Sequence, residues 1–169
     1  MTLSRGYRRL SLVPDGGFEA YTCDDGGVFC YTAAYANWVG TSFGKLDATI
    51  FSWPPYARTG KGSGLLGSAT GVDAFPGTLS PAKPLVTVPG REYKIQFFHS
   101  SSYSGQFAER DAYVEVVWNG GVVATIRPGY SQWSCYEFKV TGCGEDTLAF
   151  TGGEAPAWSF IDDVSVFAM

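Results

Sequence analysis

The sequence predicts an all-β protein built as a two-sheet antiparallel β-sandwich. Its 22 glycines and 9 prolines interrupt the chain at intervals of roughly 8 to 12 residues. Between these breaks lie short segments rich in Val, Ile, Thr and aromatic residues, which favour strands. No long stretch keeps the apolar period of a helix free of Gly and Pro. These three observations favour an all-β sandwich.

The expected strands follow one another along the chain. Three weaker segments come first, at residues 17–22, 46–52 and 64–69. Five clear segments follow: "REYKIQFFHS", "DAYVEVVWNGGVVATIRPG", "WSCYEFKVTG", "DTLAFTGG" and "WSFIDDVSVFA". In the second of these, Asn119-Gly120-Gly121 separates two alternating runs and predicts a hairpin, because such residues adopt positive φ easily.

Alternation assigns faces to these strands, because successive side chains point to opposite sides of a sheet. One face of the first hairpin strand should point to the core: Ala112, Val114, Val116 and Trp118. In the strand near residues 133–140, the apolar face carries Tyr136, Phe138 and Val140. The opposite faces of both strands predict a second surface that carries Tyr113, Glu115, Arg127, Trp133 and Lys139.

Composition limits the class of protein. A chain of 169 residues predicts one domain, residues 1–169, with residues 1–13 as an extended N-terminal arm. The net charge of −4 and the absence of a basic block exclude nucleic acid and anionic membranes as partners. No run approaches the roughly 20 apolar residues of a spanning helix, and the start lacks the apolar stretch of a signal peptide.

The four cysteines, at positions 23, 30, 135 and 143, have a spacing unlike that of zinc sites. They allow up to two disulfides among three connectivities. Cys23–Cys30 is the easiest pair, because "CDDGGVFC" is a Gly-containing loop that can fold back on itself. A strand over residues 133–140 would carry Cys143 beyond the limit of about 7 Å between Cα atoms, so Cys135–Cys143 is not expected.

Catalytic motifs are weak. "GTSFG" (40–44) matches a nucleophile elbow, but the strand-like "KLDATIFSWPP" follows instead of a helix. "GSGLLG" (62–67) matches a dinucleotide motif but also opens no helix, and His99 is the only histidine. Asp111 and Glu115 on one strand would lie about 13 Å apart, too far for glycoside hydrolysis. A cross-strand pair such as Glu115 and Glu137 stays open, so a small glycoside hydrolase or lyase is the alternative.

Aromatic residues are abundant, with five Trp, ten Tyr and twelve Phe. Several fall in expected loops: Trp38, Trp53, Tyr56, Tyr103, Phe107 and Tyr130. Sugars stack their C–H faces on aromatic rings while their hydroxyls pair with carboxylates, amides and Arg. These loop aromatics therefore favour glycan binding, although they could instead cover the open ends of the sandwich.

The last strand carries two adjacent carboxylates in its middle. By alternation Asp162 shares a face with Phe160, Val164 and Val166, which predicts that it is buried. A buried carboxylate needs a partner, either a hard cation with oxygen ligands or hydrogen bonds from backbone N–H groups or an Arg. Asp163, which faces the other way, is expected to bond to a loop.

Five segments carry a family resemblance. "PDGGFE" (14–19), Trp38, "VPGREYKIQFF" (88–98), "VEVVWNG" (114–120) and "DTLAFTGGEAPAWSFIDDVSV" (146–166) resemble the jelly-roll carbohydrate-binding modules of the CenC-like group. The resemblance implies a galactose-binding-domain-like sandwich with a structural calcium ion that joins the first and last strands. Carried onto this sequence, its side-chain ligands are Glu19 and Asp162, with Asp47 or a carbonyl near Lys45 as a further ligand.

The resemblance also implies a function, and two places for it. The expected protein is a non-catalytic, lectin-like glycan binder of the extracellular space, whose exposed sheet edges allow a homo-oligomer. A concave sheet face would use Tyr113, Glu115, Arg127 and Trp133. The loops at one end would use Trp38, Trp53, Tyr56, Tyr103 and Arg110. A structural or adhesion domain that binds protein is the remaining class.

Overall fold

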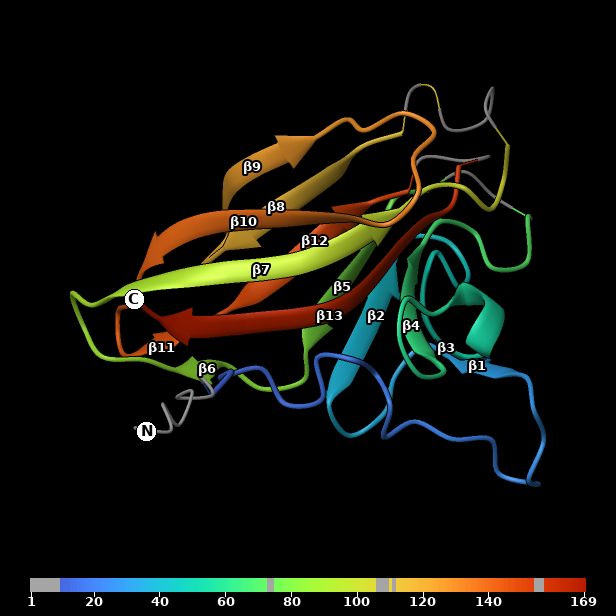
Figure 1. The fold of residues 1–169 in the computed structure, drawn as a ribbon, viewed down its shortest axis with the longest axis horizontal. Helices are drawn as coiled ribbons and strands as arrows, with labels where there is room; N and C mark the ends of the chain where they lie inside the picture. The colour runs from blue at the N-terminus through green and yellow to red at the C-terminus, as the bar shows by residue number, and fades with distance from the viewer. Residues whose placement is uncertain (1–9, 73–74, 106–109, 111, 154–156) are drawn as a thin grey trace, which may run out of the picture.

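The computed structural model describes residues 10–72, 75–105, 110, 112–153 and 157–169. Its strands form two large antiparallel sheets that pack face to face, with the six-stranded sheet in front of the five-stranded one in Figure 1. Among the described residues, the only helical element is one 3-10 turn, η1 (Pro54–Tyr56). The predicted all-β antiparallel sandwich is confirmed.

The strand order places the last strand of the chain inside the six-stranded sheet. The six-stranded sheet runs β1 (Cys30–Thr32), β3 (Ala48–Ser52), β4 (Gly62–Leu66), β13 (Ser159–Ala168), β7 (Glu92–Ser100), β10 (Ser134–Thr141). The five-stranded sheet runs β2 (Trp38–Ser42), β5 (Gly77–Pro81), β12 (Leu148–Gly152), β8 (Val114–Trp118), β9 (Gly121–Ile126). A two-stranded sheet, β6 (Leu85–Val86) and β11 (Glu145–Asp146), lies at one end of the sandwich (Figure 1).

The clear sequence segments all contain strands, and the weak ones only partly. Residues 46–52 contain β3, and residues 64–69 overlap β4. The strand predicted at residues 17–22 is wrong, because this segment forms turns. The Asp15 carboxylate accepts hydrogen bonds from the backbone N–H groups of Glu19 and Ala20, at 2.9 and 3.0 Å, and Phe18 has a φ of 58°. A side chain that caps the local backbone competes with pairing in a sheet.

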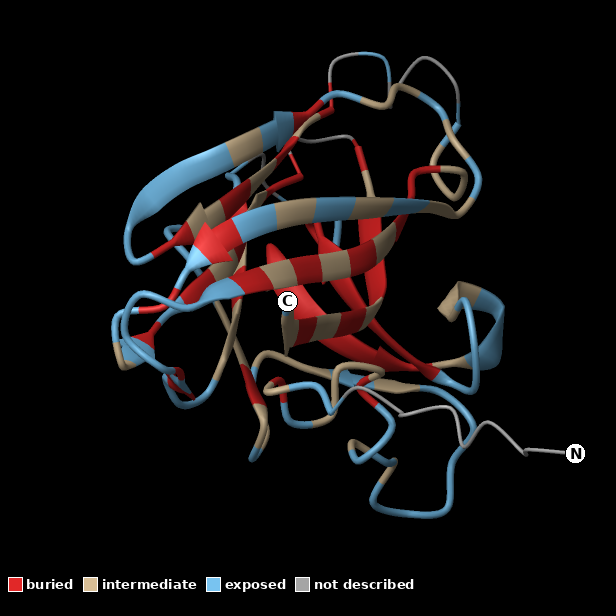
Figure 2. Cartoon of the chain, turned by 60° about the vertical axis from the view of Figure 1, so that its left-hand side comes forward, coloured by how far each residue is buried: buried red, intermediate tan, exposed pale blue. Residues whose placement is uncertain are grey.

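The core lies between the two sheets and follows the predicted faces. Ala112, Val114, Val116 and Trp118 are all buried, and Val140 is buried with Tyr136 and Phe138 packed beside it. In Figure 2 the front strands show this alternation as red bands separated by tan or pale blue ones. Trp38, expected in a loop, lies in β2 and is fully buried, with its ring centre 4.6 Å from that of Phe18. The loop assignment of Trp38 is therefore corrected.

A β-bulge in β13 changes the face that Asp162 occupies. The register with β7 shifts between Asp162 and Ser165, and Asp163 has a φ of 50°. One extra residue reverses the alternation that follows it. Val164 and Val166 therefore point into the core, whereas Phe160 belongs to a separate cluster on the outer side. Asp162 is buried as predicted, but it does not share a face with Val164 and Val166.

The N-terminal segment lies along β13. The Leu12 N–H donates to the Val166 carbonyl at 2.7 Å, and the Val164 N–H donates to the Gly16 carbonyl at 2.9 Å. A Cβ on Gly16 would lie 1.8 Å from the Val164 carbonyl oxygen, so only glycine allows this approach. Residues 10–13 of the predicted arm thus contact β13, and residues 1–9 lie outside the described residues.

The cysteines behave as their spacing predicts. Cys23 and Cys30 form a disulfide with a Cα–Cα distance of 5.6 Å. Cys135 and Cys143 are free and exposed. The pairing of the first two and the absence of a bond between the last two are both confirmed.

Candidate functional site

A row of four threonines and one glutamate, which we call the threonine row, crosses the outer face of the five-stranded sheet. The strand register places its members side by side: Thr41 on β2, Thr78 on β5, Thr151 on β12, Glu115 on β8 and Thr125 on β9. They point away from the core, because residues that alternate with them, such as Leu79 and Phe150, are fully buried. With about 4.8 Å between neighbouring strands, the row is about 19 Å long.

A hollow opens at the β2 end of this row. It has a volume of about 350 Å³ and is lined by Thr41, Ser42, Phe43, Pro76, Thr78 and Thr151. The Phe43 side chain is 94% exposed, and the hydroxyls of Thr78 and Thr151 lie 2.9 Å apart. An open aromatic ring beside fixed hydroxyl groups offers both contacts that a sugar needs, stacking and hydrogen bonding.

Three predicted residues lie on this same face. Tyr113 and Glu115 are half-buried at the start of β8, and Arg127 follows β9. The Arg127 guanidinium lies 5.4 Å from the centre of the Tyr113 ring. The face therefore combines one carboxylate, one guanidinium and two aromatic rings with the threonine hydroxyls. The structure brings Tyr113, Glu115 and Arg127 together as expected, and their role as ligand contacts stays a prediction.

Trp133 does not belong to this face. It precedes β10, which lies in the other sheet, and it packs on a cluster of Phe51, Leu65 and Phe160. Lys139 and Glu137 lie on β10 as well, where Glu137 forms an ion pair with Lys94 at 3.1 Å. The predicted surface that joined Tyr113 with Trp133 and Lys139 is therefore wrong, because the strands that carry them are in different sheets.

The aromatic cluster on the outer side of the six-stranded sheet contains two of the predicted loop aromatics, Tyr56 and Tyr103. Over Phe51, Leu65 and Phe160 pack Tyr56, Ala69, Tyr103, Trp133 and Trp158. Tyr56 has its ring centre 4.8 Å from that of Phe160, and Tyr103 lies 4.9 Å from the same ring. The Tyr56 ring is tilted against Phe160 and the Tyr103 ring meets it edge to face, so these contacts cover part of the surface of each ring. Tyr56 and Tyr103 therefore act first as packing residues.

Two of the remaining loop candidates, Trp53 and Tyr130, lie near this cluster, beside Phe29 and Ser102 respectively. Trp53 is half-buried and lines a hollow of about 370 Å³ with Val28, Pro54 and Lys61. Tyr130 is 41% exposed, and its hydroxyl donates to the Ser102 carbonyl at 3.4 Å. Arg110 is exposed, and Phe107 lies outside the described residues. These residues share no single pocket in the described part of the loops.

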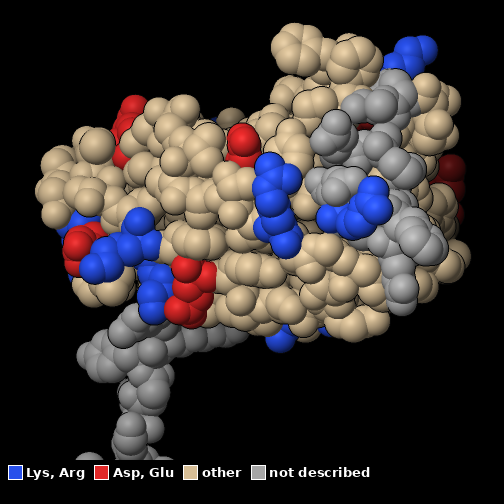
Figure 3. Space-filling model, turned by 90° about the horizontal axis from the view of Figure 1, so that it is seen from above, with Lys and Arg blue, Asp and Glu red and all other residues tan. Residues whose placement is uncertain are grey.

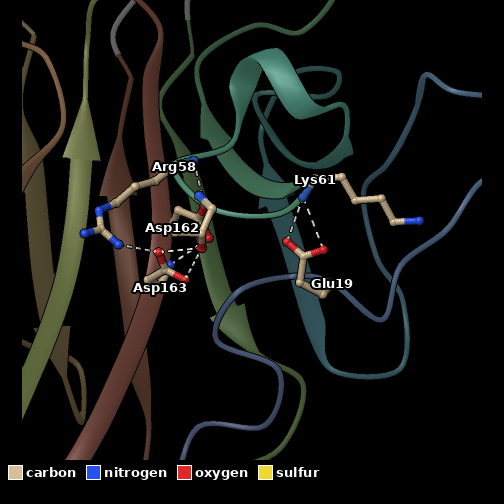
Figure 4. A network of polar contacts seen from close by, with 6 residues as sticks. Glu19, Arg58, Lys61, Asp162 and Asp163 are labelled. Carbon is tan, nitrogen blue, oxygen red and sulfur yellow. Dashed lines mark hydrogen bonds and ion pairs between the residues drawn. The ribbon is translucent and has the colours of Figure 1, made fainter.

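The predicted metal ligands Glu19 and Asp162 face one loop, residues 58–62 (Figure 4). Asp162 Oδ2 accepts from the backbone N–H of Arg58 at 2.8 Å and of Thr59 at 3.3 Å. Glu19 Oε1 accepts from the N–H groups of Lys61 and Gly62, both at 2.9 Å. The loop thereby links the segment after Gly17 to β13, as the resemblance implied for a calcium ion.

Asp163 completes this network from the bulge. Its carboxylate forms an ion pair with the Arg58 guanidinium at 2.8 Å and accepts the Thr59 hydroxyl at 2.9 Å. The prediction that Asp163 bonds to a loop is confirmed. Burial, and then the charge of Asp163, raise the pKa of the Asp162 carboxyl to about 7. In Figure 4 the Lys61 side chain points away from the carboxylates, so Arg58 is the cation that balances them there.

Asp47 lies apart from the other two predicted ligands. It precedes β3, and its carbonyl accepts the Gly67 N–H at 2.8 Å, whereas Asp162 follows Ile161, which pairs with Gly64. This register separates Asp47 from Asp162 by about 13 Å along the sheet. No group of three or more His, Cys, Asp or Glu that could hold a metal occurs among the described residues. The set of Glu19, Asp47 and Asp162 is therefore wrong as a single site.

The carboxylate oxygens of Glu19 and Asp162 are ligands of the type that a hard cation prefers. Three carboxylates, Glu19, Asp162 and Asp163, surround the loop, and Arg58 neutralises Asp163. Burial is the main cause of the raised pKa of the Asp162 carboxyl, and a cation beside it would offset this desolvation. Backbone N–H groups already occupy part of the lone-pair capacity of both carboxylates. Calcium at this junction stays a prediction.

The weak catalytic motifs do not form catalytic sites. "GTSFG" covers the end of β2 and the bend that follows it, and "GSGLLG" contains β4. His99 is fully buried on β7, and neither ring nitrogen has a hydrogen-bond partner within the described residues. Burial lowers the pKa of His99 to about 4. Glu115 and Glu137 lie in different sheets, so this cross-strand pair is excluded.

The charges on the surface are dispersed. Seen from above in Figure 3, blue and red side chains lie in small separate groups on a mostly tan surface. The described residues on this face therefore form no continuous basic patch of the kind that binds nucleic acid. Among the described residues, no helix is long and apolar enough to cross a membrane.

Comparison with solved structures identifies the fold. The module TmCBM61, solved in complex with beta-1,4-galactotriose, aligns over 95% of this chain and 99% of its own, with a TM-score of 0.62 and 16% identity. The chain has the fold of a carbohydrate-binding module. A family 16 carbohydrate-binding module aligns over 72% of this chain and 86% of its own, with a TM-score of 0.52 and 13% identity. At such identities the likeness concerns the fold alone, and the CenC-like group is not singled out.

The same fold occurs within larger proteins. The enzymatically active domain of bacteriophage CBA120 tailspike protein 4 aligns over 94% of this chain but only 21% of its own length, with a TM-score of 0.59 and 15% identity. No protein-family model and no curated protein sequence matches the chain. The fold is therefore compatible with a free-standing module and with a part of a longer protein.

The sequence reasoning missed the threonine row and Phe43. Thr78 and Thr151 alternate with buried residues, which is a visible signal, but five strands must be put in register before the hydroxyls form a line. Phe43 stands between Ser42 and Gly44 in "GTSFG", the segment that matches a nucleophile elbow. An aromatic residue in a Gly-containing turn is the signal that could have identified it.

Proposed function

We propose that this protein is a non-catalytic carbohydrate-binding domain that holds an oligosaccharide across the outer face of the five-stranded sheet. The observation that carries the proposal is the row from Thr41 to Thr125 beside the Phe43 hollow. Its length of about 19 Å suits several sugar units rather than one. The likeness to carbohydrate-binding modules supports the same conclusion.

Each part of the face has a chemical role in the proposal. Phe43 and Tyr113 stack against the C–H faces of sugar rings, because aromatic faces attract such polarised C–H groups. The threonine hydroxyls both donate to and accept from sugar hydroxyls. Glu115 accepts two hydroxyl donors in charge-assisted bonds, and Arg127 donates to ring or hydroxyl oxygens. A neutral oligosaccharide such as a short galactan, the kind of ligand bound to TmCBM61, is the first candidate.

Calorimetry with a panel of neutral oligosaccharides tests the proposal. Replacing the carboxylate in Glu115→Gln should weaken binding roughly tenfold to a hundredfold, because a hydrogen bond to a charged group is lost. The matched control is Glu137→Gln on the outer face of the other sheet, which should bind like the wild type. Absence of binding to every sugar at millimolar concentration, or equal affinity of both variants, would overturn the proposal.

A calcium ion at Glu19 and Asp162 is the finer form of the proposal, together with membership of the CenC-like group. The ion would be held by these carboxylates and would supply the positive charge that the junction around residues 58–62 lacks. A ligand that binds only the folded state stabilises it by mass action. The melting temperature should therefore fall on chelation with EDTA and recover with calcium. Glu19→Gln should reduce this response, and an unchanged melt would refute the ion.

The disulfide supports an extracellular location for this proposed role. Cys23–Cys30 closes an exposed loop, and such bonds persist in oxidising compartments. Glycans of cell surfaces and cell walls are found in the same compartments, so location and proposed ligand agree.

A further inference from the structure

The edges of the two large sheets differ in how they are protected against pairing with another chain. The six-stranded sheet ends at β1, which has three residues, and at β10, which exposes the charged Glu137 and Lys139. The five-stranded sheet ends at β2, whose Gly40 N–H donates to the Ala33 carbonyl at 2.6 Å. Short length, charged side chains and a covering segment are the usual protections of an edge strand.

β9, the fourth edge, has none of these three protections, and its one protective feature is a bulge at Val123, where the register with β8 shifts by one residue. It is six residues long, "GVVATI", and contains neither a charged residue nor a proline. Val122 is 55% exposed and Val123 42% exposed. Within the described part of the chain, its backbone pairs only with β8. β9 lies at the upper left margin of the molecule in Figure 1, and Figure 2 shows most of it as exposed.

We propose that a second copy of this chain pairs with β9, strand against strand, to form a symmetric dimer. Two identical antiparallel strands are related by a two-fold axis perpendicular to the sheet. Such an axis keeps the outer faces of both five-stranded sheets on the same side. The dimer therefore joins two threonine rows into one surface, a consequence that rests on the proposed glycan-binding function.

The composition of β9 favours a copy of itself over a charged partner. Because the strand carries no charge, pairing it with itself opposes no like charges. Arg127 follows the strand at one end only, so the two-fold axis puts the two guanidinium groups at opposite ends of the pair. The exposed parts of Val122 and Val123 become buried in the contact.

The size of the contact sets the expected affinity. Six residues of strand bury less than the roughly 1,600 Å² of a standard interface, so the dimer should be weak, with a Kd of roughly 10–100 µM. A weak dimer is still effective on a repetitive ligand, because the second binding event becomes intramolecular and avidity rises.

Analytical ultracentrifugation over about 1–500 µM tests the dimer directly, since this range brackets the expected Kd. Wild-type protein should pass from monomer to dimer, and Val123→Lys should remain monomeric, because a lysine on an edge strand blocks pairing. Val86→Lys on β6, where Val86 is 75% exposed, is the matched control and should dimerise normally. A wild-type protein that stays monomeric throughout, or a dimer that survives Val123→Lys with an unchanged circular dichroism spectrum and melting temperature, would overturn the proposal.

A second measurement separates this inference from the proposed function. On a surface coated with a polymeric glycan, Val123→Lys should bind roughly tenfold to a hundredfold more weakly than the wild type. Calorimetry with the short soluble form of that glycan should give equal affinities for the two. A dimer without any glycan binding would retain the inference and refute the function. Glycan binding by a protein that stays monomeric would support the function and refute the dimer.

Discussion

The outer sides of the two sheets show two opposite uses of strand residues. At one end of the six-stranded sheet, Tyr56, Tyr103, Trp133 and Trp158 cover Phe51, Leu65 and Phe160 and form a second small core. On the five-stranded sheet the outer side carries threonines, one carboxylate and an open Phe43. Most of the aromatic residues that the composition attributed to binding thus stabilise the fold. The candidate binding face is built mainly from small hydroxyl residues.

The largest effect expected from this comparison concerns stability. Phe160→Ala removes a fully buried ring that contacts Phe51, Tyr56, Tyr103 and Trp158, and should lower the free energy of unfolding by about 3–5 kcal/mol. Phe43→Ala, which removes an exposed ring, should change it by less than about 0.5 kcal/mol. Urea denaturation of both variants gives the comparison. Equal losses would contradict the division between a packed and an open face.

Protonation of the buried His99 should lower the free energy of unfolding. His99 is buried as the neutral form, and its pKa in the folded state is about 4, below the unfolded value near 6.5. A depressed pKa gives stability that is full above pH 6.5 and is lost as the pH falls through 4, in total about 3 kcal/mol. The raised pKa of Asp162 acts in the opposite direction over the same pH range, so the measurement is the difference in free energy of unfolding between the wild type and His99→Leu. Urea denaturation at several pH values should show that this difference shifts against the wild type as the pH falls from 6.5 through 4, and an identical pH dependence in both would refute the assignment.

The disulfide loop borders the aromatic side. Phe29, next to Cys30, has its ring centre 5.9 Å from that of Phe51. Replacing both cysteines, Cys23→Ser with Cys30→Ser, should lower the free energy of unfolding by about 2.5 kcal/mol, as expected for a short closed loop. Affinity for a soluble oligosaccharide should not change, because the row lies on the other sheet. A parallel loss of sugar affinity would mean that the two sides are coupled.

The smallest effect concerns a single hydroxyl of the row. Thr151→Val keeps the shape of the side chain but removes the hydrogen bond to Thr78, so the free energy of unfolding should fall by about 1 kcal/mol or less. Binding of an oligosaccharide should weaken roughly threefold to tenfold for the same reason. Thr141→Val, an exposed threonine on β10, is the matched control. Calorimetry that finds no difference between the two would remove Thr151 from the site.

The sequence by itself determined the local features. The Asn119-Gly120 turn, the alternation of Val114 and Val116 and the Cys23–Cys30 loop depend on residues close together in the chain, so composition and spacing predict them. The alternation also predicts burial of Asp162, but the structure buries this residue on the opposite face, against residues 58–62. Hydrogen bonds from backbone N–H groups were among the stated alternatives.

Only the tertiary structure decided which surfaces exist. The bulge at Asp163 reverses the faces of the residues that follow it in the last strand, so strict alternation in the sequence does not predict them. Trp133 and Tyr113 belong to different sheets, and Trp38 is in the core, because strand order follows from long-range pairing. The threonine row depends on the register of five strands far apart in sequence. A shift of one residue in any pair would turn its hydroxyl toward the core.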